Sequence, residues 1–420
     1  MSFLARWLPG SHVRVFPAVE VTRRNAAAEC DPREVGLDRA GVEAIWQSVV
    51  SLYQTGLHPA IALCLRRRGR VLLDRAIGHT RGNAPDDARD APRVQATPDT
   101  LFNLYSASKA ITAMLVHLLD ERGLIHLDDE VADYIPEFAR HGKRHVTLRH
   151  ILTHRAGIPN LPGGKGDLAV ATDPKRVVAL LCDARPVSVP GRQLAYHALS
   201  GGYILGEVVE RVTGRDIRTF LRDEVLAPLG FAHLNYGVRP DEIPLVAENA
   251  FTGQRAMPPY SWLLERSLGV GPRQAVDLSN SPAFLTTIVP SGNIIGTASE
   301  AGRFFQLLLD GGEQDGVRVF ERRTVRRAIA EQSFLEIDSI LGLPVRYGMG
   351  FMLGSKYASL YGYDTPHAFG HVGFTNVVAW ADPDRTISVS LMTSGKPFIT
   401  PGQVMWLNVG RTISRVCLRD

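Results

Sequence analysis

The sequence of 420 residues contains little cysteine and little lysine. Its four cysteines are scattered without Cys-x-x-Cys spacing, which predicts reduced, mostly buried thiols rather than a disulfide framework. Lysine occurs only at positions 109, 143, 165, 175, 356 and 396, and arginine supplies every other permanent positive charge. A lysine that completes a motif is therefore a stronger signal here than in an average chain.

The sequence also lacks an excess of charge and a long apolar run. Its 47 basic and 43 acidic side chains give a net charge of +4, too small to indicate a nucleic-acid partner. The longest strongly apolar segment, 110–119, is far shorter than the ~20 residues of a membrane span. Residues 1–9 lack the apolar centre of a secretory signal. We therefore expect a soluble, cytoplasmic protein without a transmembrane span, and the apolar side chains of residues 1–9 leave peripheral membrane contact open.

Hydrophobic periodicity predicts strands near both ends of the chain and helices between them. The expected strands are 59–65 and 71–77, joined as a hairpin by an arginine-rich turn, and 377–381 and 386–393. The expected helices are 37–52, 106–121, 148–153, 175–181, 199–212, 217–225 and 298–309. This order predicts an α/β (α+β) protein whose antiparallel sheet is built from both termini and interrupted by a helical insertion.

The expected division of the chain has three parts. Residues 1–35 form an irregular N-terminal arm, 36–115 with 285–420 form an α/β subdomain, and 116–284 form a helical subdomain with pocket loops. The stretch 235–295 is rich in proline and glycine and shows few regular signals. Since irregular loops on a rigid scaffold usually determine specificity, we expect it to be a pocket wall.

Ser106-Ala107-Ser108-Lys109 is the sharpest chemical feature, and no other Ser-x-x-Lys occurs in the chain. A serine at the start of a helix lies where backbone N–H groups stabilise negative charge on oxygen. A lysine three residues later lies on the same helical face, close enough to take the serine proton. Burial against the apolar helix is expected to lower the pKa of Lys109 toward that of a useful base.

Two further segments complete a candidate site. Tyr196, before a predicted helix, could relay protons if a nearby cation lowered its pKa. His371-Val372-Gly373-Phe374 leads into a predicted strand. There Gly373 would let a substrate approach the strand edge, and the Phe374 N–H could complete an oxyanion hole with that of Ser106.

The order Ser-x-x-Lys, Tyr-x-x and His-x-Gly resembles the serine β-lactamase and penicillin-binding superfamily. Segments such as Thr-His-Arg-Ala-Gly at 153–157 and Tyr-Gly-Met-Gly-Phe at 347–351 extend the likeness over about residues 37–395. The chain looks most like the class C-like branch, which includes β-lactamase-fold esterases of the family VIII carboxylesterase type. The resemblance implies a β-lactamase/transpeptidase-like fold, an acylated Ser106, a proton shuttle of Lys109 and Tyr196, support from His371, and no cofactor or metal.

Two departures from the family pattern indicate the substrate. Ala198 stands where β-lactam- and peptide-processing members usually carry asparagine, and it offers no side-chain amide. His371 replaces the lysine of a Lys-Thr-Gly motif, so a fixed cation becomes a titratable imidazole. Both favour an esterase acting on a neutral acyl ester over a β-lactamase or D-aminoacyl peptidase. Gly373, Phe102 and Trp262 are the expected substrate contacts, and Tyr260, Tyr361 and Phe374 are further candidates.

Other interpretations stay open at this point. A transacylase would use the same residues, and a binding protein could retain the fold without the activity. Ser200, in Ala198-Leu199-Ser200-Gly201-Gly202, is a near match to a lipase nucleophile elbow. The histidines at 141, 145, 150 and 154 could suggest a metal site, but no cysteine or carboxylate accompanies them at metal-ligand spacing.

Overall fold

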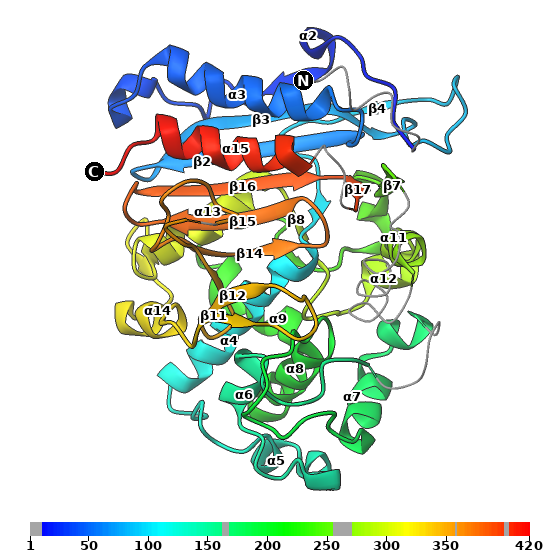
Figure 1. The fold of residues 1–420 in the computed structure, drawn as a ribbon, viewed down its shortest axis with the longest axis vertical. Helices are drawn as coiled ribbons and strands as arrows, with labels where there is room; N and C mark the ends of the chain where they lie inside the picture. Colours follow the sequence, from blue (N-terminus) through cyan, green and yellow to red (C-terminus); the bar gives the residue numbers. More distant parts are fainter. Residues whose placement is uncertain (1–10, 162–167, 255–270, 358, 399–402) are drawn as a thin grey trace.

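The computed structural model describes residues 11–161, 168–254, 271–357, 359–398 and 403–420. Figure 1 shows a large twisted sheet in its upper half, with helices on both faces, and a mostly helical region below it. The first and last described residues lie at the same end of the molecule, beside this sheet. This arrangement confirms the predicted α/β (α+β) fold, in which helices accompany a large antiparallel sheet.

The main sheet combines strands from both ends of the chain. Across the described residues it has the order β1-β3-β2-β16-β15-β14-β13-β12-β11, with β4 paired to β3. Its strands are β1 (Thr22–Arg24), β2 (Ala60–Arg67), β3 (Arg70–Arg81), β4 (Val94–Gln95), β11 (Ser333–Ile337), β12 (Pro344–Tyr347), β13 (Met352–Leu353), β14 (Phe369–Gly373), β15 (Val377–Asp382) and β16 (Ile387–Thr393). The antiparallel pairing of β2 with β16, in which Cys64 opposes Ser390, joins the two halves of the sequence.

Short strands and helices complete the structure. The small sheets contain β5 (Phe102–Asn103), β8 (Ile294–Gly296) and β6 (Asn235–Tyr236), then β7 (Ala250–Thr252) with β17 (Gly395–Pro397), and β9 (Glu313–Gln314) with β10 (Val317–Arg318). The α-helices are α2 (Ala18–Val21), α3 (Arg39–Tyr53), α4 (Ser108–Glu121), α5 (Val131–Tyr134), α6 (Leu148–Leu152), α7 (Pro174–Asp183), α8 (Ser200–Thr213), α9 (Ile217–Leu221), α11 (Pro272–Ser279), α12 (Pro282–Thr286), α13 (Ala298–Leu309), α14 (Arg322–Ala328) and α15 (Gln403–Val416).

Both faces of the sheet are buried, which makes this region a three-layer structure (Figure 1). In β2 the small side chains of Ala60, Ala62 and Cys64 face the core shared with α13 and α4. The intervening large side chains face α3 and α15. Small residues allow the close approach of α13, where a methyl group added to Gly302 would lie 3.4 Å from Cys64 Sγ. Because successive side chains of a strand point to opposite faces, the small residues of β2 pack against one helix layer and the large residues pack against the other.

Helix α4 connects the sheet to the helical region. All of its residues from Ser108 to Leu119 are buried, as expected for a helix that is packed on every side. It contacts α8, α14 and β14, which belong to distant parts of the sequence. The first turn of α4 is therefore held between the sheet and the helical region, and the candidate nucleophile precedes it directly.

One prediction about the less regular regions was wrong. The N-terminal arm is not wholly irregular, because β1 pairs with β3 at the edge of the main sheet. The stretch 235–295 contains three short strands and the helices α11 and α12 in its described part, which are too short to produce a clear periodic pattern. The division into subdomains stays a prediction. Within the described part of the chain, no helix combines the length and apolar character needed to cross a bilayer.

Candidate active site

Ser106 lies in a tight turn just before α4 rather than within the helix itself. This 3-10 turn covers Tyr105–Ala107, and Ser106 is partly exposed while its neighbours on both sides are buried. Tyr105 has a φ of 48°, a left-handed conformation that costs a non-glycine residue free energy. The Asn103 side chain supports the turn by accepting a hydrogen bond of 2.9 Å from the Tyr105 N–H. The turn therefore places the partly exposed Ser106 directly before the buried helix α4.

Lys109 brings its amine to the Ser106 hydroxyl, as the Ser-x-x-Lys spacing predicts. Its Nζ lies 3.1 Å from Ser106 Oγ, 2.6 Å from the Ala198 carbonyl oxygen and 3.2 Å from the Ser291 carbonyl oxygen. The side chain is buried, and this burial lowers the pKa of Lys109 well below its usual value. Lowering the pKa favours the neutral amine, which is the form that can act as a base.

The three polar contacts of Lys109 are compatible with the neutral amine that its lowered pKa favours. A neutral amine has two N–H donors and one lone pair. The carbonyl oxygens of Ala198 and Ser291 can only accept, so they take the two N–H groups. For a neutral amine, the lone pair is then left for the third neighbour, the Ser106 hydroxyl oxygen, which lies 3.1 Å from Nζ. A neutral Lys109 in this position would be within reach of the Ser106 proton, as the sequence-based prediction of a general base requires.

Tyr196 joins the same site from the segment before α8. It is hydrogen-bonded to Ser106, and its ring centroid lies 4.9 Å from Lys109 Nζ. The expectation that a nearby cation lowers the pKa of Tyr196 was wrong, because burial raises this pKa above its ordinary value. Tyr196 therefore remains protonated at rest and is suited to donating a proton rather than to removing one.

Three buried histidines surround Lys109 and Tyr196. Burial lowers the pKa of both His371 and His197 to about 3, and it also lowers that of His154 well below the usual value. Charge on Lys109 would lower all three further. The rings of His154 and His371 lie 4.8 and 6.2 Å from that of Tyr196. At neutral pH these imidazoles are uncharged, so His371 does not provide a substitute for a lysine cation.

The end of β14 lies against the turn that carries Ser106. A methyl group added to Gly373 would lie 2.3 Å from the Leu104 carbonyl oxygen, so only glycine allows this approach. The next side chain, Phe374, packs on Tyr105 with a ring separation of 5.4 Å. The end of β14 thus lies beside the turn that carries Ser106, and an oxyanion hole formed by the N–H groups of Ser106 and Phe374 stays a prediction.

Asp338 is a candidate positioning residue that the sequence did not reveal. Its fully buried Oδ1 accepts hydrogen bonds from the backbone N–H groups of Tyr196, Ile340 and Leu341, at 3.1, 2.9 and 3.0 Å. One carboxylate thus joins the backbone of Tyr196 to the turn after β11. No local pattern marks this aspartate, since its partner lies 142 residues away.

Several other predicted contacts lie elsewhere or outside the described residues. Phe102 pairs with Gly296 in the small sheet and is 1% exposed within the core, so its expected substrate contact is corrected to a packing role. Tyr361 is likewise buried, stacked on Trp380. Trp262 and Tyr260 lie outside the described residues.

The alternative nucleophile Ser200 is unsuited to that role. Its side chain is fully buried at the start of α8, and its hydroxyl donates a 2.6 Å hydrogen bond to the Ile158 carbonyl oxygen. The candidate metal histidines are dispersed, with His141 paired to Asp183 and His154 packed on Tyr196. Among the described residues, no group of three or more histidine, cysteine, aspartate or glutamate side chains could hold a metal ion.

Comparisons with known proteins identify the family of the chain. The sequence pattern of the family described as Beta-lactamase matches residues 48–412. The chain is 29% identical over 309 residues to the esterase/beta-lactamase LipL of Mycobacterium tuberculosis, covering 70% of this chain and 69% of LipL. A family VIII carboxylesterase structure superimposes with a TM-score of 0.76 and 26% identity, covering 91% of this chain and 99% of the other. A penicillin-binding protein homologue from Caulobacter crescentus has the same TM-score, identity and coverage.

Proposed function

The chain belongs to the beta-lactamase family, and from this premise we propose that it is a serine hydrolase that cleaves carboxylic esters through an acyl-enzyme on Ser106. The observation that carries the proposal is the position of the buried Lys109 amine, which lies 3.1 Å from Ser106 Oγ and within hydrogen-bond distance of the Ala198 and Ser291 carbonyl oxygens. A buried, neutral lysine in this position has no need of a second charged partner to act as a base.

The reaction follows from the protonation states of the resting site. Lys109 takes the Ser106 proton as Oγ attacks the ester carbonyl carbon, and the resulting oxyanion is held by the N–H groups of Ser106 and Phe374. The Tyr196 hydroxyl donates its proton to the oxygen of the departing alcohol, and the proton on Lys109 restores the tyrosine. Water then attacks the acyl carbon as Lys109 takes one of its protons, and Lys109 returns that proton to Ser106 Oγ as the acyl–oxygen bond breaks, which releases the carboxylic acid and regenerates Ser106.

The polar groups around the nucleophile favour an ester over a peptide or a β-lactam. Ala198 directs only its backbone carbonyl to the site, where it accepts from Lys109, and it has no side-chain amide for a substrate amide. His371 is neutral, with Nδ1 donating to the Val372 carbonyl oxygen at 2.8 Å. A substrate carboxylate would find no fixed cation on these two side chains. Gly373 and Phe374 are the substrate contacts that this arrangement supports.

Labelling with a fluorophosphonate, followed by intact-mass measurement and peptide mapping, tests the nucleophile. We expect one adduct on the peptide that contains Ser106, no adduct with Ser106→Ala, and normal labelling with the matched control Ser200→Ala. Ser106→Ala should also abolish hydrolysis of p-nitrophenyl butyrate. An adduct on Ser200, or near-normal hydrolysis by Ser106→Ala, would contradict the proposal.

A second measurement distinguishes hydrolysis from acyl transfer. Because both reactions use one acyl-enzyme, the product ratio decides between them. With an added short-chain alcohol, a hydrolase releases mainly free acid, whereas a transacylase releases mainly the new ester. Predominant ester formation would keep Ser106 as the nucleophile and change the proposed reaction to acyl transfer.

A further inference from the structure

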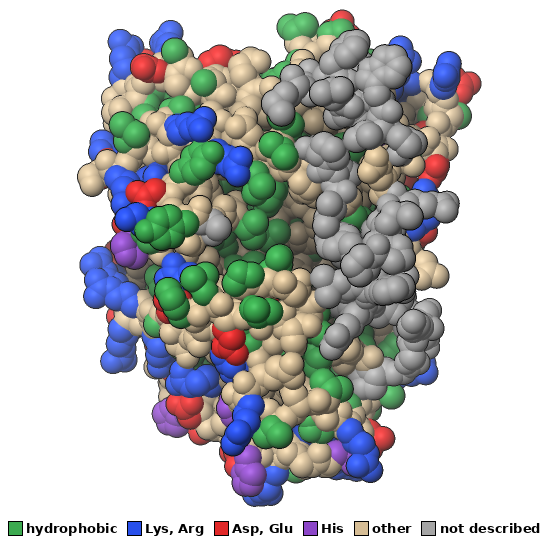
Figure 2. Space-filling view, in the orientation of Figure 1, with side chains coloured by type: hydrophobic (Ala, Val, Ile, Leu, Met, Phe, Trp, Pro, Cys, Tyr) green, Lys and Arg blue, Asp and Glu red, His purple; other side chains and the backbone are tan. Residues whose placement is uncertain are grey.

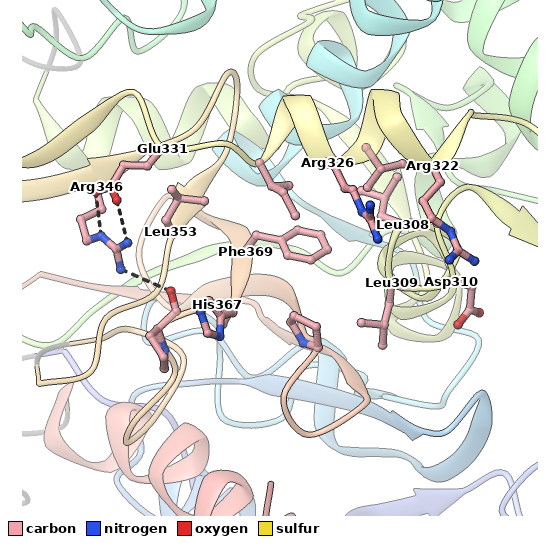
Figure 3. Close-up of a pocket in the computed structure, with 16 residues that line it drawn as sticks. Leu308, Leu309, Asp310, Arg322, Arg326, Glu331, Arg346, Leu353, His367 and Phe369 are labelled. Atoms are coloured by element: carbon pink, nitrogen blue, oxygen red, sulfur yellow. Dashed lines mark hydrogen bonds and ion pairs between the residues drawn. The ribbon is translucent and has the colours of Figure 1, made fainter. Parts of the chain in front are cut away.

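A cavity of about 820 Å³ lies between α14, the end of α13 and the start of β14 (Figure 3). None of the candidate active-site residues lines it. Its volume falls within the range of about 300–1,000 Å³ that small-molecule sites occupy. Helix α14 lies at the left edge of the molecule in Figure 1. Lys and Arg side chains are numerous at the same edge of the molecular surface in Figure 2.

One side of the cavity is apolar. Leu308 and Leu309 from α13, Leu353 from β13 and Phe369 from β14 line it together with Val325 from α14. In Figure 3 the side chains of Leu353 and Phe369 lie between the two charged ends of the cavity. These residues come from four different elements of the fold, so their positions are fixed by the packing of the main sheet against its helices.

Two arginines without partners border the apolar surface. Arg322 and Arg326 are spaced four residues apart on α14, so they share one face of the helix, and both are exposed. Figure 3 shows the Arg326 guanidinium group beside Leu308, whereas the Arg322 side chain extends toward Asp310. Neither forms a hydrogen bond or an ion pair with another residue in the described part of the chain.

The other charged groups of the cavity are already engaged. Arg346 forms a two-pronged ion pair with Glu331, with both N–O distances 2.9 Å. His367 pairs with Asp384 at 2.9 Å. The Asp310 carboxylate accepts hydrogen bonds from Gln306 and lies at the same end as Arg322. Two free guanidinium groups against one carboxylate leave the cavity with a net charge of about +1.

We propose that this cavity is a second ligand site, which binds an amphipathic monocarboxylate such as the anion of a medium- or long-chain fatty acid. The carboxylate pairs with Arg322 and Arg326, and the hydrocarbon chain lies on the leucines and Phe369. A ligand with a single negative charge balances the net charge of about +1 in the cavity. A phosphate dianion would instead leave an excess of negative charge beside Asp310. The proposal concerns residues remote from Ser106 and does not depend on the esterase reaction.

Calorimetric titration with decanoate tests the site. We expect saturable binding, at least tenfold weaker binding by Arg322→Gln/Arg326→Gln, and less than a twofold change with Arg323→Gln. Arg323 is the matched control, because it is an exposed arginine of the same helix that does not line the cavity. Acetate, which lacks the chain, and decanamide, which lacks the charge, should each bind at least tenfold more weakly than decanoate.

A repeat of the titration with fluorophosphonate-labelled protein separates this site from the active site. Unchanged decanoate binding after labelling supports the cavity. Loss of binding after labelling would place the ligand at Ser106 and overturn the proposal, as would undiminished binding by the double variant. Acetate binding as tight as decanoate binding would overturn the role of the apolar surface. Failure of the labelling itself would count against the proposed esterase function, while the arginine variants would still test the cavity.

Discussion

Replacement of Asp338 by alanine should slow ester hydrolysis by ~100-fold without unfolding the protein. The fully buried carboxylate accepts three backbone hydrogen bonds, including one from the Tyr196 N–H. Leaving three buried N–H groups unpaired at about 1–3 kcal/mol each costs about 3–9 kcal/mol of stability. Since a folded protein has about 5–15 kcal/mol available, the variant should keep its fold at the assay temperature with a markedly lower melting temperature.

The expected loss of rate comes from the position of Tyr196. Without Asp338, the backbone of the Tyr196 segment is released from the turn after β11, and a displacement of about 1 Å can cost ~100-fold in rate, or about 2.7 kcal/mol. The matched control is Asp338→Asn, whose amide oxygen can still accept the three N–H groups. It should stay within about threefold of the wild-type rate, because the geometry is kept while the charge is removed.

Initial rates with p-nitrophenyl butyrate and thermal unfolding measure the two effects separately. A positioning role predicts that kcat falls more than KM and that the rate of fluorophosphonate labelling falls with it. Wild-type kcat in Asp338→Ala would refute the reasoning. If Asp338→Asn were as slow as Asp338→Ala, the charge of the carboxylate rather than its hydrogen bonds would be the cause.

Three further predictions concern the base and the packing around it. Lys109→Met should reduce kcat/KM by at least ~1,000-fold and retain the fold, measured by ester hydrolysis and circular dichroism, because it removes the base but keeps an apolar stem. Because burial lowers the pKa of Lys109, kcat/KM should rise with pH through this lowered value and level off well below the usual pKa of lysine; a rise that continues to about pH 10.5 would contradict the assignment. Gly202→Ala should lower both stability and activity, since the added carbon would lie 2.1 Å from Ser291 Oγ and displace a residue whose carbonyl accepts from Lys109. The neighbouring Gly201→Ala, with no atom nearer than 3.3 Å, is its control, and equal effects of the two substitutions on melting temperature and rate would exclude this explanation.

Elements with strong periodicity and clear ends were predicted well from the sequence. The hairpin of β2 and β3 and the strands β15 and β16 were expected within a few residues. Helix α13 has the predicted bounds, Ala298–Leu309, and Thr297 caps it by accepting from the Glu300 N–H at 3.1 Å. In each of these cases the local pattern and the tertiary environment favour the same structure.

Helices α14 and α15 were missed for different reasons. The sequence of α14 is dominated by arginine, and only Thr324, Val325 and Ala328 of its residues are buried, so the apolar pattern is too short to recognise. In α15 the signal was present, because Trp406, Val409 and Ile413 are buried at helical spacing. The cavity beside α14 could not be expected without that helix.

The sequence by itself determined the Ser106–Lys109 pair, because two residues three apart across a 3-10 turn and the first residues of the following helix meet through local geometry alone. It also determined the alternation that buries both faces of β2. Only the tertiary structure decided how the pair works. The carbonyl groups that orient the Lys109 amine lie 89 and 182 residues away, and the pKa values of Lys109 and Tyr196 are shifted by burial. Burial and long-range contacts depend on the packing of distant segments, which a local sequence pattern does not contain.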